Sequence, residues 1–224
     1  MSSWINRTVL SGSSVAENGT TSHTCTFTAA TSGSLLIAVL AGSVTSTTPS
    51  GWSLVISAIN FTGLYVFSKT ASAGESSFST THNTANFAIE GVVYEFYTGS
   101  SVVGTAGSAT SMSSNATGPA CTSLTGTYTS FAARSWDMSA TNSSASAAWT
   151  LPSIEDYDAS VPKVTNDGIY LTTAYDDNST GTSFTPSSTL TLINTTGNGE
   201  GVSFALSVTT PPAASNATIA WLKA

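Results

Sequence analysis

Two glutamates, Glu90 and Glu95, come nearest in type and spacing to a catalytic pair. Retaining glycosidases place two carboxyl groups about 5–5.5 Å apart, one as nucleophile and one as acid and base. Some all-β members of that class carry their acids on one strand as Glu-x-Asp-x-x-Glu, but here the middle position is Val92. One hypothesis from this pair is that the protein is a glycoside hydrolase. The alternative is that both glutamates lie on the solvent side or at the end of a strand.

A second acidic group is rich in aspartate. Asp156 and Asp158 fall in one cluster, and Asp176 and Asp177 begin an oxygen-rich turn further along. Ca²⁺ takes six to eight oxygen ligands from such loops, although the spacing does not match an EF-hand. Asp and Asn also close turns through their own side chains, so turn formation is the alternative. These four aspartates are the candidates for a Ca²⁺ site, and no other cofactor is predicted.

Nucleophilic catalysis finds no support in the sequence. The segment 74–78, Gly-Glu-Ser-Ser-Phe, lacks the final glycine of a nucleophile elbow, and the two histidines, His23 and His82, read as surface hydrogen-bonding residues. No catalytic residue is therefore assigned, and the chain is predicted not to be an enzyme. Cys25 and Cys121 are too few for a disulfide framework. One bridge between strands and two separate buried thiols both remain open.

Tryptophans offer a different chemistry, because an exposed indole face can stack on a sugar ring. Trp136 and Trp149 are flanked by small and polar residues and are the candidates for glycan binding. Burial in the core or at a subunit contact is the alternative for both. Trp52 follows a turn and Trp221 alternates with Ile219, so these two are predicted to be buried.

Composition limits the classes of partner. Charged residues make up 8% of the chain, against roughly 25% in an ordinary soluble domain. The net charge is −7 and the five basic residues are scattered singly, so no nucleic-acid partner is expected. About a third of the residues are Ser or Thr, yet 40% are hydrophobic and occur in short runs. The chain can therefore bury a core rather than remain disordered.

Targeting signals are not evident. The longest apolar run, 35–41, is far shorter than the roughly 20 residues that a spanning helix needs, so no membrane insertion is expected. The first seven residues lack the basic and apolar regions of a signal peptide. We expect the protein to stay in the cytoplasm or to leave by another route, such as release inside a particle.

The elements that must position these residues are strands. In 201–209, Val202, Phe204, Leu206 and Val208 alternate with small or polar residues, and similar alternation recurs along the chain between Gly-, Asn- and Pro-rich turns. No segment has a sustained helical stripe. The sequence thus predicts an all-β protein, an antiparallel β-sandwich of jelly-roll type with little or no helix. The run 35–41 is apolar on both faces and is predicted to be a central strand between layers.

One strand changes phase. The apolar positions of 87–98 shift after Glu90-Gly91, which predicts a β-bulge there. Without a bulge, either Glu90 would point into the core or the two halves of the strand would face opposite ways.

The whole of 1–224 is predicted to be a single domain. Residues 100–119 are polar and read as a long loop or an edge strand. Residues 211–215 resemble a linker, after which 216–223 is predicted to form a strand that docks back on the sandwich.

Four segments together resemble a module of tailed-bacteriophage virion proteins. They are the strand 33–41, the Pro-Ser-Gly-Trp turn at 49–52 with the strand that follows, the hairpin from Leu64 through Lys69 to Glu75, and the strand 93–99. The resemblance covers roughly the first 100 residues, and its motifs are turn and core signatures that speak to fold more than to activity.

The resemblance implies a non-enzymatic structural protein of the virion, either a minor tail protein or a decoration protein on the capsid surface. Its implied partners are copies of itself and other virion proteins, and its implied location is the virion. The alternative is a virion adhesion module that binds a host surface glycan. A lectin-like glycoside hydrolase is the third hypothesis.

Overall fold

The computed structural model describes residues 4–9, 22–42, 47–60, 62–81, 89–112, 115–139, 145–149, 154–162, 167–192 and 199–209. Within these ranges every regular element is a strand, and all strand pairs are antiparallel. The prediction of an all-β antiparallel sandwich is confirmed. No described segment forms a helix that could cross a membrane.

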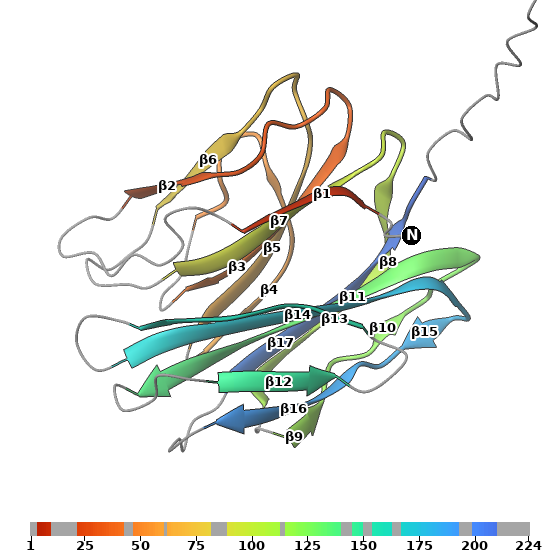
Figure 1. Ribbon diagram of the computed structural model, residues 1–224. Coiled ribbons are helices and arrows are strands. Elements are labelled where there is room, and N and C mark those ends of the chain that lie inside the picture. The colour runs from red at the N-terminus through yellow and green to blue at the C-terminus, as the bar shows by residue number, and fades with distance from the viewer. Residues whose placement is uncertain are drawn as a thin grey trace, which may run out of the picture.

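Two large sheets form the body of the molecule (Figure 1). The five-stranded sheet has the spatial order β1 (Trp4–Val9), β7 (Ile89–Phe96), β3 (Leu35–Gly42), β5 (Gly63–Thr70) and β4 (Ser53–Ile59). The seven-stranded sheet has the order β13 (Ile154–Pro162), β14 (Asp167–Thr180), β11 (Thr127–Ser139), β17 (Gly199–Ser207), β8 (Ser101–Met112), β10 (Cys121–Thr122) and β15 (Ser183–Phe184).

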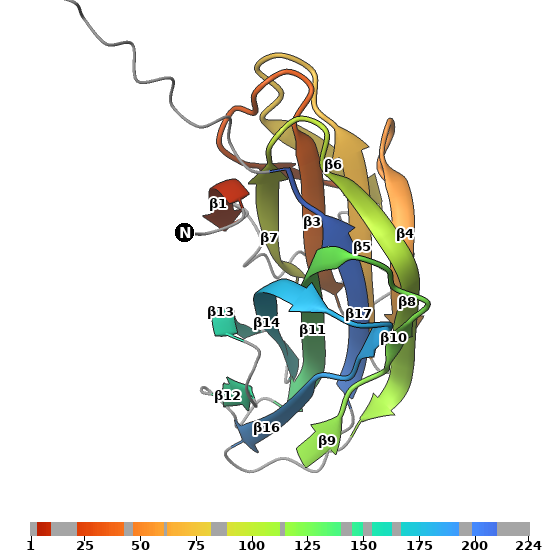
Figure 2. The same ribbon diagram turned by 90° about the vertical axis from the view of Figure 1, so that its right-hand side faces the viewer.

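Two small sheets cover the outer faces of this body. The ribbon of β2 (Ser22–Thr26) and β6 (Ser77–Thr81) lies over the five-stranded sheet, and the three strands β12 (Ala145–Trp149), β16 (Ser187–Leu192) and β9 (Asn115–Thr117) lie beside the seven-stranded sheet (Figures 1 and 2). The β2–β6 ribbon buries part of the outer face of the five-stranded sheet, where Cys25 and Phe78 pack against Leu36 and Phe67.

Strand β3 lies between two cores, as predicted. All eight of its residues are buried. Leu35, Ile37 and Val39 face the inner core, between the two large sheets. Leu36 and Leu40 face the outer core, between the five-stranded sheet and the β2–β6 ribbon. The alternation follows from the two-residue period of a strand, and it explains why this run is apolar at every position.

The predicted bulge at Glu90-Gly91 is wrong. The pairing of β7 with β3 runs without a register shift from Ile89 opposite Gly42 to Phe96 opposite Leu35. Glu90 therefore lies on the same face as Val92 and is buried. The sequence showed an acidic residue at a core position and offered two readings, and the strand adopts the one that places the carboxyl inside.

A bulge does occur in the edge strand β4. Its register against β5 shifts between Leu54 and Ile56. Leu54 pairs with Phe67 and Ile59 pairs with Gly63, four positions apart on β5. Because residues an even number apart on a strand share a face, the bulge places Leu54 and Ile59 on one face. That face points outward, because Phe67, which pairs with Leu54, belongs to the outer core.

The polar region 100–119 contributes strands rather than a long loop. Most of it is β8, which lies between β17 and β10 and is therefore not an edge strand, whereas β9 is an edge strand of the three-stranded sheet. The predicted C-terminal strand 216–223 lies outside the described residues.

Candidate functional site

Glu90 and Glu95 do not form a catalytic pair. They are five positions apart on a regular strand, so their side chains lie on opposite faces of the five-stranded sheet. Neither lies on the solvent side, since Glu90 is 4% and Glu95 3% exposed. Glu95 Oε1 accepts a hydrogen bond of 2.6 Å from the backbone N–H of Thr31. Glu95 thus anchors the turn before β3, and the two carboxyls share no cleft.

A third glutamate, Glu200, occupies a more elaborate environment. It is fully buried at the start of β17, between the two large sheets. Its Oε1 accepts the backbone N–H of Thr62 at 3.1 Å, and its Oε2 accepts the Thr62 hydroxyl and, at 3.3 Å, the Ser135 hydroxyl. The carboxylate therefore ties the β4–β5 turn of one sheet to β17 and β11 of the other. Its position within a Gly- and Asn-rich turn cluster gave no sign of this role.

Arg134 is a buried cation on the outer face of the seven-stranded sheet. It is 1% exposed, and its Nη1 donates to the carbonyl oxygen of Ser188 at 3.3 Å and to the Ser188 hydroxyl at 2.5 Å. Desolvation lowers the pKa of the Arg134 guanidinium to about 10, while Tyr170 acts in the opposite direction. Arg134 thereby links β11 to the three-stranded sheet through β16.

The two tryptophans proposed for glycan binding differ in exposure. Trp136 is 1% exposed, and the Arg134 Cζ lies 5.9 Å from the centre of its ring. An exposed indole face at Trp136 is therefore excluded. Trp149 is half-buried, and its Nε1 donates to the Thr172 hydroxyl at 3.0 Å. That bond fixes the orientation of the indole between β12 and β14.

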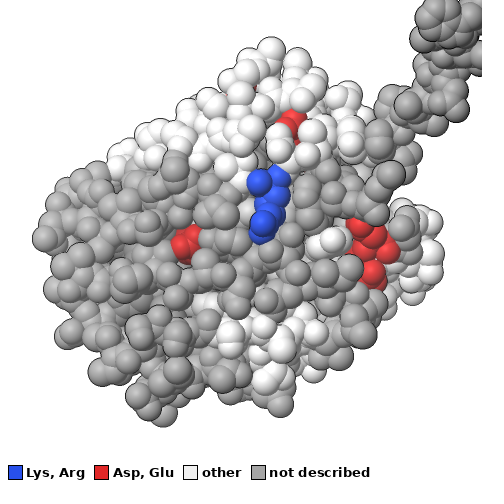
Figure 3. Space-filling model, viewed as in Figure 1, with Lys and Arg blue, Asp and Glu red and all other residues white. Residues whose placement is uncertain are grey.

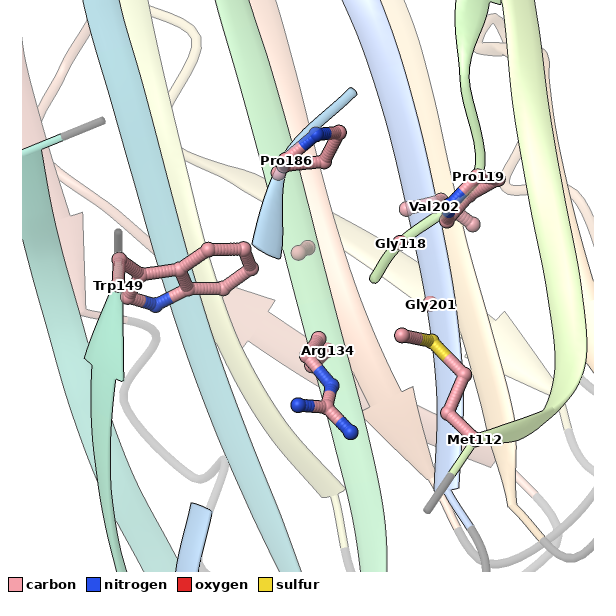
Figure 4. Close-up of a pocket in the computed structure, with 10 residues that line it drawn as sticks. Met112, Gly118, Pro119, Arg134, Trp149, Pro186, Gly201 and Val202 are labelled. Carbon is pink, nitrogen blue, oxygen red and sulfur yellow. The ribbon is translucent and has the colours of Figure 1, made fainter. Parts of the chain in front are cut away.

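Trp149 and Arg134 line a small pocket that Figure 4 shows in close-up. Met112, Pro119 and Pro186 form other parts of its wall. The empty space is about 150 Å³ including the part open to solvent, and it is too narrow to hold a water molecule. The pocket combines one aromatic side chain with one cation, which is a suitable pair for a sugar bearing an acidic group. A space that admits no water molecule also admits no sugar in this conformation.

The four aspartates proposed for Ca²⁺ lie on neighbouring strands. Asp158 pairs with Thr172, and Asp156 is the bulged residue between Glu155 and Tyr157. Both therefore lie opposite positions of β14 that are two or more residues away from Asp176. Asp176 Oδ2 accepts the Ser179 hydroxyl at 3.0 Å, and Asp177 Oδ1 accepts the Thr129 hydroxyl at 3.3 Å. In the described part of the chain no three His, Cys, Asp or Glu side chains come together as metal ligands. The side chains of Asp156 and Asp158 lie outside that part, so their Ca²⁺ role stays a prediction.

The two cysteines are separate buried thiols rather than a bridge. Cys25 belongs to the outer core, whereas Cys121 packs with Leu124 and Tyr128 on the far side of the seven-stranded sheet. Burial raises the pKa of the Cys25 thiol to about 12 and raises that of Cys121. A thiol that stays protonated is neither a nucleophile nor a metal ligand at neutral pH, so both act as small hydrophobic residues. Of the histidines, His23 lies on β2 and His82 lies outside the described residues.

The residues that carry the phage-like motifs have structural roles. Lys69 Nζ forms an ion pair of 2.6 Å with Glu75 Oε1, and Glu75 Oε2 accepts the backbone N–H of Ser72. Trp52 is buried in the outer core, with its ring centre 5.1 Å from that of Phe78. These motifs therefore fix turns and a core.

The described residues form one exposed apolar feature outside these sites. Leu54 is 48% and Ile59 44% exposed, and they are the large hydrophobic residues that the described chain leaves exposed. We call this pair the β4 strip. Among the described strands, β4 is the last of its sheet and pairs with β5 alone, and it contains no charged residue from Ser53 to Ile59. On the face drawn in Figure 3, the Lys or Arg side chains of described residues gather in one place and the Asp or Glu side chains in several others.

Comparison with known proteins gives no family model, no curated protein and no solved structure that matches this chain.

Proposed function

We propose that the protein is a non-enzymatic structural component of a tailed-bacteriophage virion, a minor tail protein or a capsid decoration protein. The observation that carries this proposal is the β4 strip. Natural edge strands are usually protected by charges, proline or a covering element, and β4 has exposed apolar side chains instead. Exposed apolar side chains on the outward face of an edge strand are suited to contact with another subunit.

Two further features support an assembly role. The resemblance to virion proteins rests on residues that fix turns and a core, among them Trp52, Lys69 and Glu75. In addition, Glu90 and Glu95 lie on opposite faces of their sheet, which removes the constellation that favoured a glycoside hydrolase.

The test is the copy number of the protein in purified phage particles, measured by quantitative mass spectrometry against the major capsid protein. Hundreds of copies would indicate a capsid or tail-tube surface, and a few copies would indicate the tail tip. Absence from particles, in cells that produce the protein during infection, would overturn the proposal.

A second candidate function is adhesion to a host surface glycan. The observation that favours it is the half-buried Trp149 beside Arg134 in the small pocket. Binding of the full chain to an array of cell-wall glycans tests it. Saturable binding that Trp149→Ala abolishes, with Trp52→Phe as a control in the outer core, would support adhesion. Failure to bind any glycan would leave the structural role as the function.

A further inference from the structure

We propose that the three-stranded sheet of β12, β16 and β9 opens away from the body while the two large sheets stay folded, and that this opening uncovers Arg134. The inference goes beyond the proposed function, because it concerns a motion within one chain and needs no partner.

The three-stranded sheet is not joined to either large sheet by backbone pairing. β16 pairs with β12 on one side and with β9 on the other, and in the described part of the chain neither outer strand pairs with a strand of another sheet. The ladder of backbone hydrogen bonds therefore holds this sheet together but does not hold it to the body.

The sheet also lacks the apolar anchor that the other small sheet has. Among its described side chains, Ser188 is the one that is buried, and none belongs to a hydrophobic cluster. In the β2–β6 ribbon, by contrast, Cys25 and Phe78 are buried in the outer core. Because burial of apolar surface is the main source of stability, the three-stranded sheet is the less firmly attached of the two small sheets.

Polar contacts attach the three-stranded sheet instead. Arg134 on β11 donates to the carbonyl oxygen and to the hydroxyl of Ser188, and Trp149 donates to the hydroxyl of Thr172 on β14. Beside these contacts the layers enclose the small pocket, a space too narrow for water across which packing contacts are lost. Attachment by a few hydrogen bonds, with little apolar burial, is typical of segments that open locally.

The cation beneath the sheet favours opening. Arg134 is 1% exposed, and burial is the main reason why its pKa falls to about 10. When the sheet moves away, the guanidinium regains its hydration, which offsets part of the loss of its two hydrogen bonds to Ser188.

The opened sheet stays attached to the body. In the chain, β9, β12 and β16 each stand between two strands of the seven-stranded sheet, so the sheet can close again after it opens. The open form would bring the guanidinium of Arg134 and the indole of Trp149 to solvent. The adhesion candidate needs such a form, since the closed space admits no sugar.

The experiment treats the native full chain with phenylglyoxal, which reacts with arginine, and locates the label by peptide mass spectrometry. The chain has two arginines, so Arg7, which is exposed, is the internal control and should react at once. Arg134 should react slowly in the folded protein. Its rate should hardly change at urea concentrations below the unfolding transition, because a local opening exposes little new surface.

Amide hydrogen exchange provides the second readout. The amides of β16 should be at least about tenfold less protected from exchange than those of β17, which lies inside the seven-stranded sheet and reports unfolding of the body.

Two variants each remove one of the polar contacts. Ser188→Ala removes the hydroxyl that Arg134 contacts and should speed the labelling of Arg134 by about tenfold, the effect expected for a hydrogen bond to a charged group. Thr172→Val removes the acceptor of Trp149 and should speed the labelling by about fivefold.

Thr24→Ala is the matched control in the other small sheet. It removes an exposed hydroxyl that lies 2.8 Å from that of Ser79, and it should leave the labelling of Arg134 unchanged. The proposal is overturned if Arg134 reacts only in urea that unfolds the body, with β16 and β17 equally protected in water. It is also overturned if Thr24→Ala speeds the labelling as much as Ser188→Ala does, since equal effects would indicate a general loss of stability.

Discussion

The buried carboxylate of Glu200 accepts both the backbone N–H and the hydroxyl of Thr62, so that one side chain on β17 fixes the β4–β5 turn of the opposite sheet. Ser135 on β11 donates a further hydrogen bond to the same carboxylate. The inner core, which is otherwise apolar along most of its length, ends at this polar junction.

Replacement of Glu200 by Gln should destabilise the fold. An amide offers one acceptor oxygen where the carboxylate offers two, and its NH₂ group would face the Thr62 and Ser135 hydroxyls. We expect the free energy of unfolding in urea to fall by about 2–3 kcal/mol, the usual value for hydrogen bonds to a buried charged group. Glu75→Gln, at the partly exposed ion pair with Lys69, is the matched control and should cost less than about 1 kcal/mol. Equal losses in the two variants would contradict the role given to Glu200.

The Cys25 thiol should make stability depend on alkaline pH. Burial raises the pKa of this thiol to about 12, whereas in the unfolded chain the thiol ionises near 9.0, the ordinary value for cysteine. Between those values the folded state holds more protons, so the free energy of unfolding falls as pH rises, by about 1.4 kcal/mol per unit at this group. Below pH 9 the contribution is constant.

Other groups titrate in the same range, so the comparison must be with a variant. Burial lowers the pKa of Arg134, which acts with the opposite sign, and raises the pKa of Tyr128, which acts with the same sign. Unfolding in urea is measured for the unmodified chain and for Cys25→Ala, at about pH 8 and about pH 10.5. The difference between the two chains cancels the contributions of Arg134 and Tyr128, which both chains share. The variant should show the shallower decline, and parallel declines would refute the assignment.

The hydrogen bond from Trp149 to Thr172 should hold the three-stranded sheet to the body. Trp149→Phe keeps an aromatic ring but removes the N–H donor, and Thr172→Val removes the acceptor. A double-mutant cycle in thermal or urea unfolding should give a coupling energy of about 1 kcal/mol. If the two losses simply add, the bond does not contribute to stability.

Gly199 should tolerate no side chain. A Cβ there would overlap the carbonyl oxygen of Ser135 and the ring of Trp136, neither of which can swing away within the sheet. Gly199→Ala should lower the free energy of unfolding by about 2–3 kcal/mol, as overpacking of a core does. Gly74→Ala is the comparison, since its Cβ would meet nothing within 4 Å and only the positive φ of 71° opposes it. Gly74→Ala should lower the free energy of unfolding by about 1 kcal/mol. A larger loss in Gly74→Ala than in Gly199→Ala would contradict the close packing described at Gly199.

The sequence allowed the fold class and the most buried strand to be predicted, because both follow from side-chain periodicity. Leu35 to Ala41 is apolar at every position, and only a strand covered on both faces needs that pattern. The change of phase of the apolar positions after Glu90-Gly91 predicts a bulge, but the strand is regular there and the carboxyl of Glu90 is buried instead. An acidic residue at a core position looks the same in a sequence whether the strand bulges or the carboxyl is buried.

The candidate sites depended on partners far away in the chain. The Glu200 site needs Thr62, which lies more than a hundred residues earlier. The packing of the Trp136 ring depends on the absence of a side chain at Gly199. No local spacing encodes such pairs. Similarly, the exposure of Leu54 and Ile59 on one face arises from a bulge, since residues five apart on a regular strand would lie on opposite faces.

The place of β17 constrains how the protein is made. β17 is the last described strand in the chain, yet it lies in the interior of the seven-stranded sheet, between β11 and β8. A nascent chain still on the ribosome therefore has β11 and β8 without the strand that joins them, and the inner face of the five-stranded sheet is without much of its cover. Folding of the two large sheets can therefore finish only after β17 has been synthesised, and a chain that still lacks it exposes apolar surface and is prone to aggregate.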